Sequence, residues 1–319
     1  MSLSNPPTFT QVLRPFAAER FADGFDVTAT GVAGSGIGPM AITEAPDGDV
    51  LISGGPAREQ IDRFRSDGRT AGGVWTQVDH PVFNLVFDTE GRLWATTGGG
   101  PLLELDPSDG NVLAQHGDGL TMGLAVDPIS GDVFVGSPYG VDRCDPAPET
   151  FPRYGRDQNL RVGSLAFAED GTLYGAVWPQ RDAVVRFGAL GRAETVLTFE
   201  TPIDSIAIGT ADSPIAGLMF VTHNSGDVGF GQSVAGGGAS DLTMVDLVTL
   251  RRIAVADGGT RGDVVATTRD GRILVSQSDS VDVVSPLQIP EIVATLPATE
   301  TIVALPLGLG RDTFHQGMF

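Results

Sequence analysis

Oxygen-bearing side chains stand where several of the expected strands begin, and they are the first candidates for chemistry. Three of them, Asn84, Asp204 and Asp263, belong to different repeat units of the chain. Carboxylate and amide oxygens that converge from several directions suit a hard divalent cation such as Ca²⁺ or Mg²⁺. The alternative is that these residues cap strand ends and bind water around a central channel.

A second group of polar and aromatic residues follows the second strand of several units. We place this group on the same face as the first and expect that face to bind the ligand; its members are Trp178, His223, Asn224, Gln277 and Asp279. Among all of these residues, His223 and Asp263 are the candidates for general acid–base chemistry.

The longest glycine-rich stretch, "HNSGDVGFGQSVAGGGAS" (223–240), resembles a phosphate-binding loop only in composition. Such a loop needs a following helix and a lysine, and the sequence offers neither here. The stretch is therefore predicted to be a hairpin loop of about 17 residues, and loops of that length tend to be functional or mobile. A flexible lid over a ligand and a disordered insertion both stay open.

The charge composition excludes several functions. The formal net charge is −20, and all 20 basic residues are arginines. A chain without lysine has no Walker P-loop, no Schiff base and no lysine general base. Its acidic surface repels nucleic acid and anionic membranes and favours neutral or cationic ligands. We expect a small molecule or a protein as the partner, and a monomer.

The single cysteine, Cys144, excludes an internal disulfide and a cysteine-based zinc cluster. It lies in an expected strand, where a buried thiol is the favoured interpretation. No signal peptide and no apolar run long enough to span a bilayer is visible. The compartment is therefore unknown, and cytoplasmic if the start of the chain is native.

An internal repeat positions these residues. Each unit has a short apolar strand, a turn with glycine and a second apolar strand, and six units are explicit: 40–55, 84–99, 123–137, 164–178, 205–223 and 263–278. A third and usually a fourth strand follow. Turns such as "PDGD" and "RDGR" suit tight hairpins. Four antiparallel strands per unit, repeated around a ring, are typical of a β-propeller.

The chain ends predict a further blade. Each end of the chain is predicted to form a pair of strands. The pair at the amino end is 10–16 with 26–32, and the pair at the carboxyl end is 301–308 with 313–319. Two pairs make one blade closed by both termini, which leaves no free sheet edge. We therefore predict an all-β, seven-bladed propeller formed by one domain over residues 1–319, with six blades as the alternative.

The segment "FNLVFDTEGRLWATTGG" (83–99) resembles a conserved motif of the SMP-30/gluconolactonase family, and the units more broadly resemble NHL-type and streptogramin-lyase-type repeats. The resemblance to these lactonases implies a six-bladed propeller that binds a divalent metal. Asn84 matches a metal-ligand position of the family, and Asp263 loosely matches its catalytic aspartate. Two positions depart from that pattern. Ile37 stands where the family has a metal-binding glutamate, and Val162 or Gly163 stands where it has a second asparagine. Of the histidines that streptogramin lyases use, only His223 is placed to match.

Two functions from different classes remain. The first is a non-catalytic propeller that binds a ligand or partner on one face. The alternative is a divalent-metal-dependent hydrolase, lactonase or lyase with its site at the channel mouth, using Asn84, Asp204 and Asp263 as ligands and His223 as acid or base. The sequence leaves open whether the protein is an enzyme.

Overall fold

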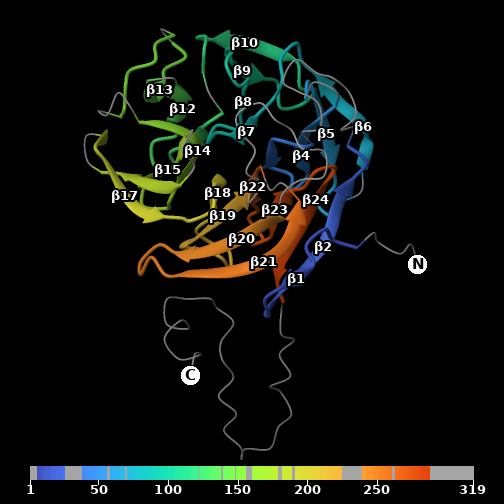
Figure 1. Ribbon diagram of the computed structural model, residues 1–319. Helices are drawn as coiled ribbons and strands as arrows, with labels where there is room; N and C mark the ends of the chain where they lie inside the picture. Colours follow the sequence, from blue (N-terminus) through green and yellow to red (C-terminus); the bar gives the residue numbers. More distant parts are fainter. Residues whose placement is uncertain are drawn as a thin grey trace, which may run out of the picture.

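The computed structural model describes residues 6–25, 38–55, 58–68, 70–120, 122–137, 139–147, 149–155, 160–178, 182–188, 191–224, 239–260 and 263–287. Six antiparallel sheets stand around a central channel in the described part of the chain (Figure 1). The all-β propeller predicted from the repeat is therefore confirmed. Within the same residues, no helix is long and apolar enough to cross a membrane.

The strands of each blade follow one another outward from the channel. Blades one to three contain β3 (Ile42–Glu44), β4 (Val50–Gly54), β5 (Gln60–Phe64) and β6 (Thr70–Gln77); β7 (Asn84–Phe87), β8 (Leu93–Thr96), β9 (Leu102–Leu105) and β10 (Val112–His116); and β11 (Leu124–Val126), β12 (Val133–Ser137) and β13 (Gly140–Cys144).

Blades four to six continue this order, and the last two each gain a strand from the beginning of the chain. They contain β14 (Arg161–Phe167), β15 (Leu173–Trp178), β16 (Ala183–Phe187) and β17 (Ala193–Thr198); β18 (Ile203–Ile208), β19 (Leu218–Asn224), β20 (Ala239–Asp246), β21 (Arg252–Thr260) and β1 (Gln11–Val12); and β22 (Val265–Thr267), β23 (Ile273–Ser276), β24 (Ser280–Pro286) and β2 (Phe16–Asp23).

Local sequence explains the inner hairpins. In blade two, the amide of Gly91 donates to the carbonyl of Asp88 at 3.0 Å. Gly91 has φ of +83°, and the corresponding Gly271 of blade six has φ of +86°. Glycine adopts this left-handed conformation without the penalty that a Cβ imposes. The Gly-containing turns of the repeat thus close each first strand onto the second, and all six predicted inner hairpins are present.

The core lies between neighbouring blades, because both faces of each sheet are covered. Strand β4, for example, is buried at all of its residues. A strand buried on both faces carries apolar residues without alternation. Val50 and Ile52 pack toward blade six, whereas Leu51 packs toward blade two.

The ring closes with six blades, so the predicted count of seven is wrong and the six-bladed alternative is correct. Each inner strand lies against the next, in the order β3, β7, β11, β14, β18 and β22, and β22 lies against β3. The predicted segment 10–16 contributes β1 to blade five and the start of β2 to blade six. Segments 26–32, 301–308 and 313–319 lie outside the described residues.

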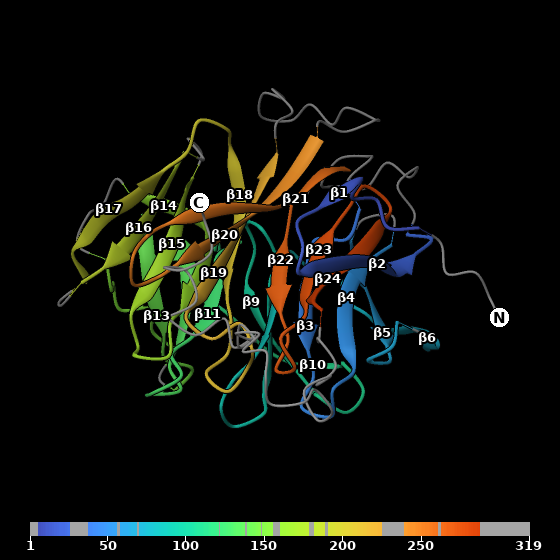
Figure 2. The ribbon, with the colours of Figure 1, turned by 90° about the horizontal axis from the view of Figure 1, so that it is seen from below.

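Blade six is completed by the amino-terminal strand. Strand β2 pairs with β24 from Phe16↔Pro286 to Asp23↔Ser280 and so takes the place of the fourth strand of this blade. Figure 2 shows β2 in blue beside β24 in red. Asp282 of β24 is fully buried and accepts hydrogen bonds from the amides of Thr8 (2.7 Å) and Phe9 (3.1 Å) and from Nε of Arg20 (2.9 Å). These contacts fix β2 and the residues before β1 to blade six.

Candidate functional site

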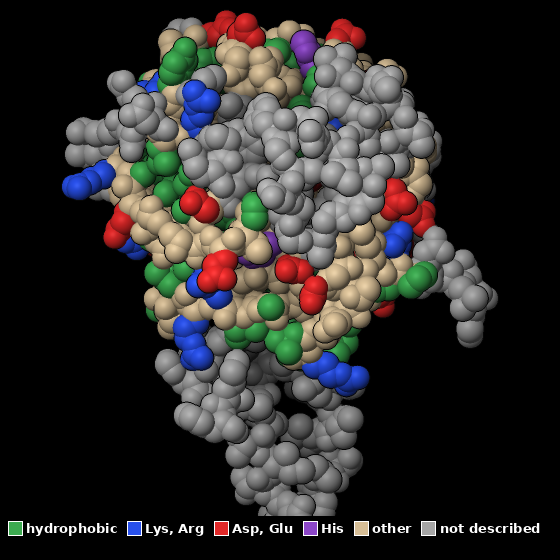
Figure 3. Space-filling view, viewed as in Figure 1, with side chains coloured by type: hydrophobic (Ala, Val, Ile, Leu, Met, Phe, Trp, Pro, Cys, Tyr) green, Lys and Arg blue, Asp and Glu red, His purple; other side chains and the backbone are tan. Residues whose placement is uncertain are grey.

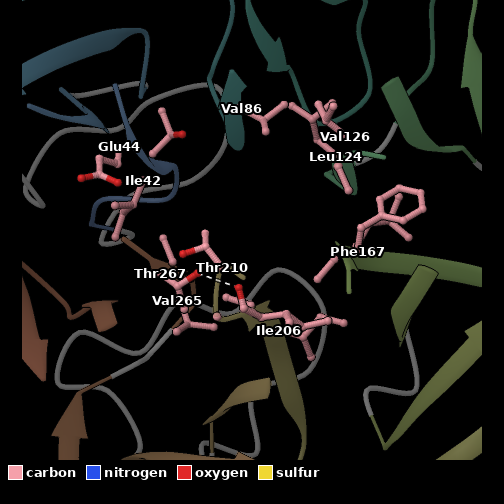
Figure 4. Close-up of a pocket in the computed structure, with 18 of the residues that line it drawn as sticks. Ile42, Glu44, Val86, Leu124, Val126, Phe167, Ile206, Thr210, Val265 and Thr267 are labelled. Carbon is pink, nitrogen blue, oxygen red and sulfur yellow. Dashed lines mark hydrogen bonds between the residues drawn. The ribbon is translucent and has the colours of Figure 1, made fainter. Parts of the chain in front are cut away.

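The six inner strands surround a cavity of about 670 Å³ in the channel. Its lining includes residues of every blade, and Figure 4 shows their side chains around a common opening. The labelled side chains come from all six inner strands or the turns that follow them: Ile42, Glu44, Val86, Leu124, Val126, Phe167, Ile206, Thr210, Val265 and Thr267. The cavity is thus a product of the ring, and no single blade forms it.

Apolar side chains make most of the cavity wall. Val86, Leu124 and Val126 lie on one side of it, with Ile206 and Val265 opposite (Figure 4). Inner strands need β-branched and aliphatic residues to pack against both neighbouring blades. The same residue types therefore line the channel, and Leu124, Ile206 and Val265, which are 3–4% exposed, also belong to the cores between the blades.

The described lining residues differ in exposure between the two ends of the cavity, and we take as its mouth the end at the hairpins that join first to second strands. Toward the beginnings of the inner strands, Ser164 and Ser205 are 5% and 6% exposed. At the other end, Glu169, Thr210 and Asp212 of the lining are exposed. The exposed end is the mouth. It lies on the face opposite to the one on which the sequence placed the ligand.

Hydroxyl groups in the cavity wall join neighbouring blades. Oγ of Ser164 in blade four accepts a hydrogen bond from the amide of Ile206 in blade five at 3.1 Å, and lies 3.4 Å from Oγ of Ser205. Oγ1 of Thr267 in blade six donates to the carbonyl of Ile208 at 2.8 Å. These bonds hold the inner strands at a fixed spacing and so set the width of the channel.

An ion pair between blades one and six borders the mouth. Oε2 of Glu44 accepts from the amide of Arg269 at 2.8 Å and from its Nε at 3.1 Å. Nη2 of Arg269 also donates to the carbonyls of Ala45 (2.6 Å) and Pro46 (3.1 Å). The Glu44 side chain is 11% exposed and that of Arg269 is 55% exposed. Glu44 therefore neutralises the only arginine among the lining residues.

Of the three predicted metal ligands, only Asn84 lines the cavity. Its Oδ1 accepts a hydrogen bond from the amide of Leu85 at 2.9 Å. Asp204 of β18 and Asp263 just before β22 are half-buried and do not line it. In the described part of the chain, no group of three or more His, Cys, Asp and Glu side chains is arranged to hold a metal ion. The described residues do not fit a metal centre of that kind, and the cation stays a sequence prediction.

His223 is buried between blades four and five. It is 4% exposed, its Nδ1 lies 3.0 Å from Oγ1 of Thr201, and its ring centroid lies 4.9 Å from that of Phe199. Burial lowers the pKa of His223 to about 4. The ring is therefore neutral at physiological pH, and it does not line the cavity.

The other residues predicted for the ligand face lie at strand ends. Trp178 ends β15 and Asn224 ends β19. Gln277 is buried, and its Oε1 accepts from the amide of Thr260 at 2.5 Å. Asp279 is exposed in the turn between β23 and β24, and its carbonyl accepts from the amide of Phe25 at 3.2 Å. Residues 225–238 of the glycine-rich stretch lie outside the described residues.

The residues at the mouth were not among those predicted from the sequence. Glu44 ends β3, and Glu169, Asp212 and Arg269 belong to the turns of the inner hairpins, which were interpreted only as turn sequences. One signal was present. The turn "GTADSPIAG" of blade five (209–217) is longer than its counterparts and carries Thr210 and Asp212. A longer turn at one end of the channel indicates that additional residues border the channel there.

Comparison with known proteins gives the fold. No protein-family description matches the sequence, and no curated protein is similar to it. Among solved structures, virginiamycin B lyase from Staphylococcus aureus is similar over 85% of this chain and 100% of that chain, with a TM-score of 0.55 and 14% identity. A gluconolactonase-like protein is similar over 88% of this chain and 96% of that one (TM-score 0.62, 15% identity).

An auxiliary nutrient binding protein from Bacteroides ovatus is also similar, over 87% of this chain and 78% of that one, with a TM-score of 0.63 and 10% identity. These similarities confirm the predicted resemblance to SMP-30-like and streptogramin-lyase-like propellers at the level of the fold. At such low sequence identities, the structural similarities give no information about the activity of this protein. One fold of this kind hosts lyases and binding proteins alike, and the site has to decide between them.

Proposed function

We propose that this protein is a non-catalytic binding propeller, and that it holds a small, largely apolar molecule in the channel. The cavity carries this proposal. Its volume of about 670 Å³ lies within the roughly 300–1,000 Å³ of ligand pockets. Its apolar wall and few polar groups match the usual construction of such pockets, in which apolar surface supplies affinity and the polar groups orient the ligand.

The chemistry of the lining supports binding over catalysis. The polar residues that line the cavity are serines, threonines, one asparagine, three carboxylates and Arg269. The hydroxyls of Ser164 and Thr267 already bond to neighbouring strands, and Glu44 is paired with Arg269. A general acid or base needs a group within hydrogen-bond reach of the substrate and a pKa near the working pH. His223, the candidate from the sequence, is neutral and lies outside the lining.

A neutral apolar dye, Nile red, tests the proposal. We expect one saturable site per chain, with enhanced fluorescence when the dye leaves water for the apolar channel. Thr210→Trp places a large side chain at the exposed mouth, and we expect it to weaken binding by about tenfold, the equivalent of ~1.4 kcal/mol. Thr195→Trp, on the exposed outer strand of blade four, is the matched control and should bind as the unaltered protein does. The absence of saturable binding, or equal binding by both variants, would contradict the proposal.

A melting experiment separates this function from the metal-dependent alternative. A ligand that binds only the native state raises its melting temperature. We therefore compare melting in EDTA with melting in Ca²⁺ or Mg²⁺, for the unaltered protein and for Asp263→Ala. A rise with either cation that disappears in Asp263→Ala favours the hydrolase or lyase.

A further inference from the structure

We propose that the ligand of the channel is a cationic amphiphile, whose positive group lies between Glu169 and Asp212 at the mouth while its apolar part fills the cavity. This inference rests on the proposed function and names the class of molecule that the site accepts.

The charges at the mouth are the first argument. The lining contains four charged residues, namely Glu44, Glu169, Asp212 and Arg269. The charge of Arg269 is matched by Glu44, whose Oε2 accepts a hydrogen bond from Nε of Arg269 at 3.1 Å. Glu169 and Asp212 remain, and they give the mouth a net charge of −2 (three carboxylates and one guanidinium).

The position of the two carboxylates is the second argument. Glu169 lies in the hairpin between β14 and β15, and Asp212 in the turn between β18 and β19. Strands β14 and β18 are adjacent in the ring, so these turns border the same side of the mouth. Both residues are exposed. Their carboxylates therefore stay hydrated until a ligand arrives and pay no burial cost while the site is empty.

The contrast between the mouth and the wall is the third argument. A charged group that moved down among Val86, Leu124 and Val265 would lose its hydration without gaining a partner, which is costly. An amphiphile avoids this cost only if its charge stays at the mouth. A bare divalent cation fits less well, because it requires six to eight oxygen ligands and the wall beneath the mouth is apolar.

The charge of the whole molecule acts in the same direction. With a net charge of −20, the protein repels an anion before it reaches the channel. In the view of Figure 3, acidic side chains lie around the described part of the surface, with arginines between them. A mouth lined by one sign of charge above low-dielectric walls concentrates ions of the opposite sign.

Three probes with the same chain and different head groups test the inference: hexyltrimethylammonium, hexan-1-ol and hexanesulfonate. Their dissociation constants are measured by displacement of Nile red at low and at physiological ionic strength. We expect the ammonium compound to bind about fivefold more tightly than the alcohol or better, since one charge pair at 4 Å contributes about 1 kcal/mol in water. The sulfonate should bind most weakly, and added salt should reduce the differences.

A double variant, Glu169→Gln with Asp212→Asn, assigns the preference to the mouth. We expect the ratio of the two dissociation constants, alcohol to ammonium, to fall toward one. The matched control, Glu19→Gln with Glu200→Gln, removes two exposed acidic charges elsewhere on the surface and should keep the ratio.

The outcomes separate this inference from the proposed function. Equal binding of the three probes, tighter binding of the sulfonate, or a ratio that survives the mouth variant overturns the cationic ligand and leaves the channel as a site for neutral molecules. Failure of every probe, Nile red included, overturns the proposed function itself.

Discussion

Burial decides what His223 can do. The side chain packs on Phe199 with a pKa of about 4, below the ordinary value of 6.5. Between these pH values the unfolded state therefore binds more protons than the folded state. The stability that the folded protein gains while His223 is neutral is complete above pH 6.5 and is lost as the pH falls toward 4. A shift of this size corresponds to about 3 kcal/mol.

We expect His223→Gln to remove this acid sensitivity. The free energy of unfolding of both proteins is measured in urea at about pH 7 and about pH 4. The difference between the two proteins at the higher pH corrects for any loss of packing. Asp241, the cross-strand neighbour of His223, has a raised pKa because of burial and because of Asp257. It titrates in both proteins, so it cancels in the comparison. Equal acid sensitivity of the two proteins would contradict the prediction.

Asp88 is a buried carboxylate that organises the turn of blade two. Its Oδ2 accepts from Nε1 of Trp94 (2.9 Å) and from Nε of Arg92 (2.7 Å). Burial acts to raise the pKa of Asp88, but these hydrogen bonds and the charge of Arg92 outweigh it and hold the pKa below its usual value. We expect Asp88→Asn to lower the free energy of unfolding by about 2 kcal/mol, because a charge-assisted acceptor is lost in a buried place.

Asp127→Asn is the matched control for Asp88→Asn. Asp127 holds the corresponding position in blade three, where its carboxylate accepts from two groups of an exposed turn, the amide of Ile129 and Oγ of Ser130. Its loss should cost less than 1 kcal/mol, as expected for exposed hydrogen bonds. Urea denaturation measures both, and equal losses would argue against a special role for the buried carboxylate.

At the scale of elements, the hairpins of blades one and six are joined by the Glu44–Arg269 pair. We expect Arg269→Ala to lower the free energy of unfolding by about 1 kcal/mol, the upper end for a partly exposed ion pair. Arg186→Ala breaks the exposed Arg186–Glu194 pair within blade four and should cost less. Thermal melting compares the two variants. An effect of Arg269→Ala no larger than that of Arg186→Ala would show that the pair does not help to close the ring.

The inner hairpins were predictable because their signals are local. A run such as "LWAT" in β8, preceded by a Gly turn, predicts a buried strand within a window of ten residues. The pairing of β2 with β24 leaves no local signal, since its partners are far apart in the sequence. The blade count depends on that pairing, and so it was predicted wrongly.

The site was harder to predict than the elements. The residues of its wall, such as Val126 and Val265, have the same types as core residues, and Val265 is itself part of the core between blades five and six. The polar residues that drew attention in the sequence include His223 and Gln277, which the fold buries. A polar residue at a strand end signals either a site or a satisfied core position, and the sequence does not separate the two.

At the scale of the whole molecule, the ring depends on its amino-terminal strand. We expect a chain that lacks residues 1–24 to melt at a much lower temperature, because β24 loses its partner and Asp282 loses its donors. A synthetic peptide of residues 6–25, added in excess, should restore part of the loss, since a strand can be supplied from outside. The control peptide carries the same residues in scrambled order. Full stability of the shortened chain would contradict this account.

The pairing of β2 with β24 also has a consequence for biosynthesis. Strand β2 leaves the ribosome more than 250 residues before its partner β24. At roughly 5–20 residues per second, translation keeps the two strands apart for about 10–50 s. During that interval blades one to five can form, but the edge of β2 has no partner. The ring can close only when synthesis has passed blade six, so β2, which is made before blade one, is among the last strands to find its place.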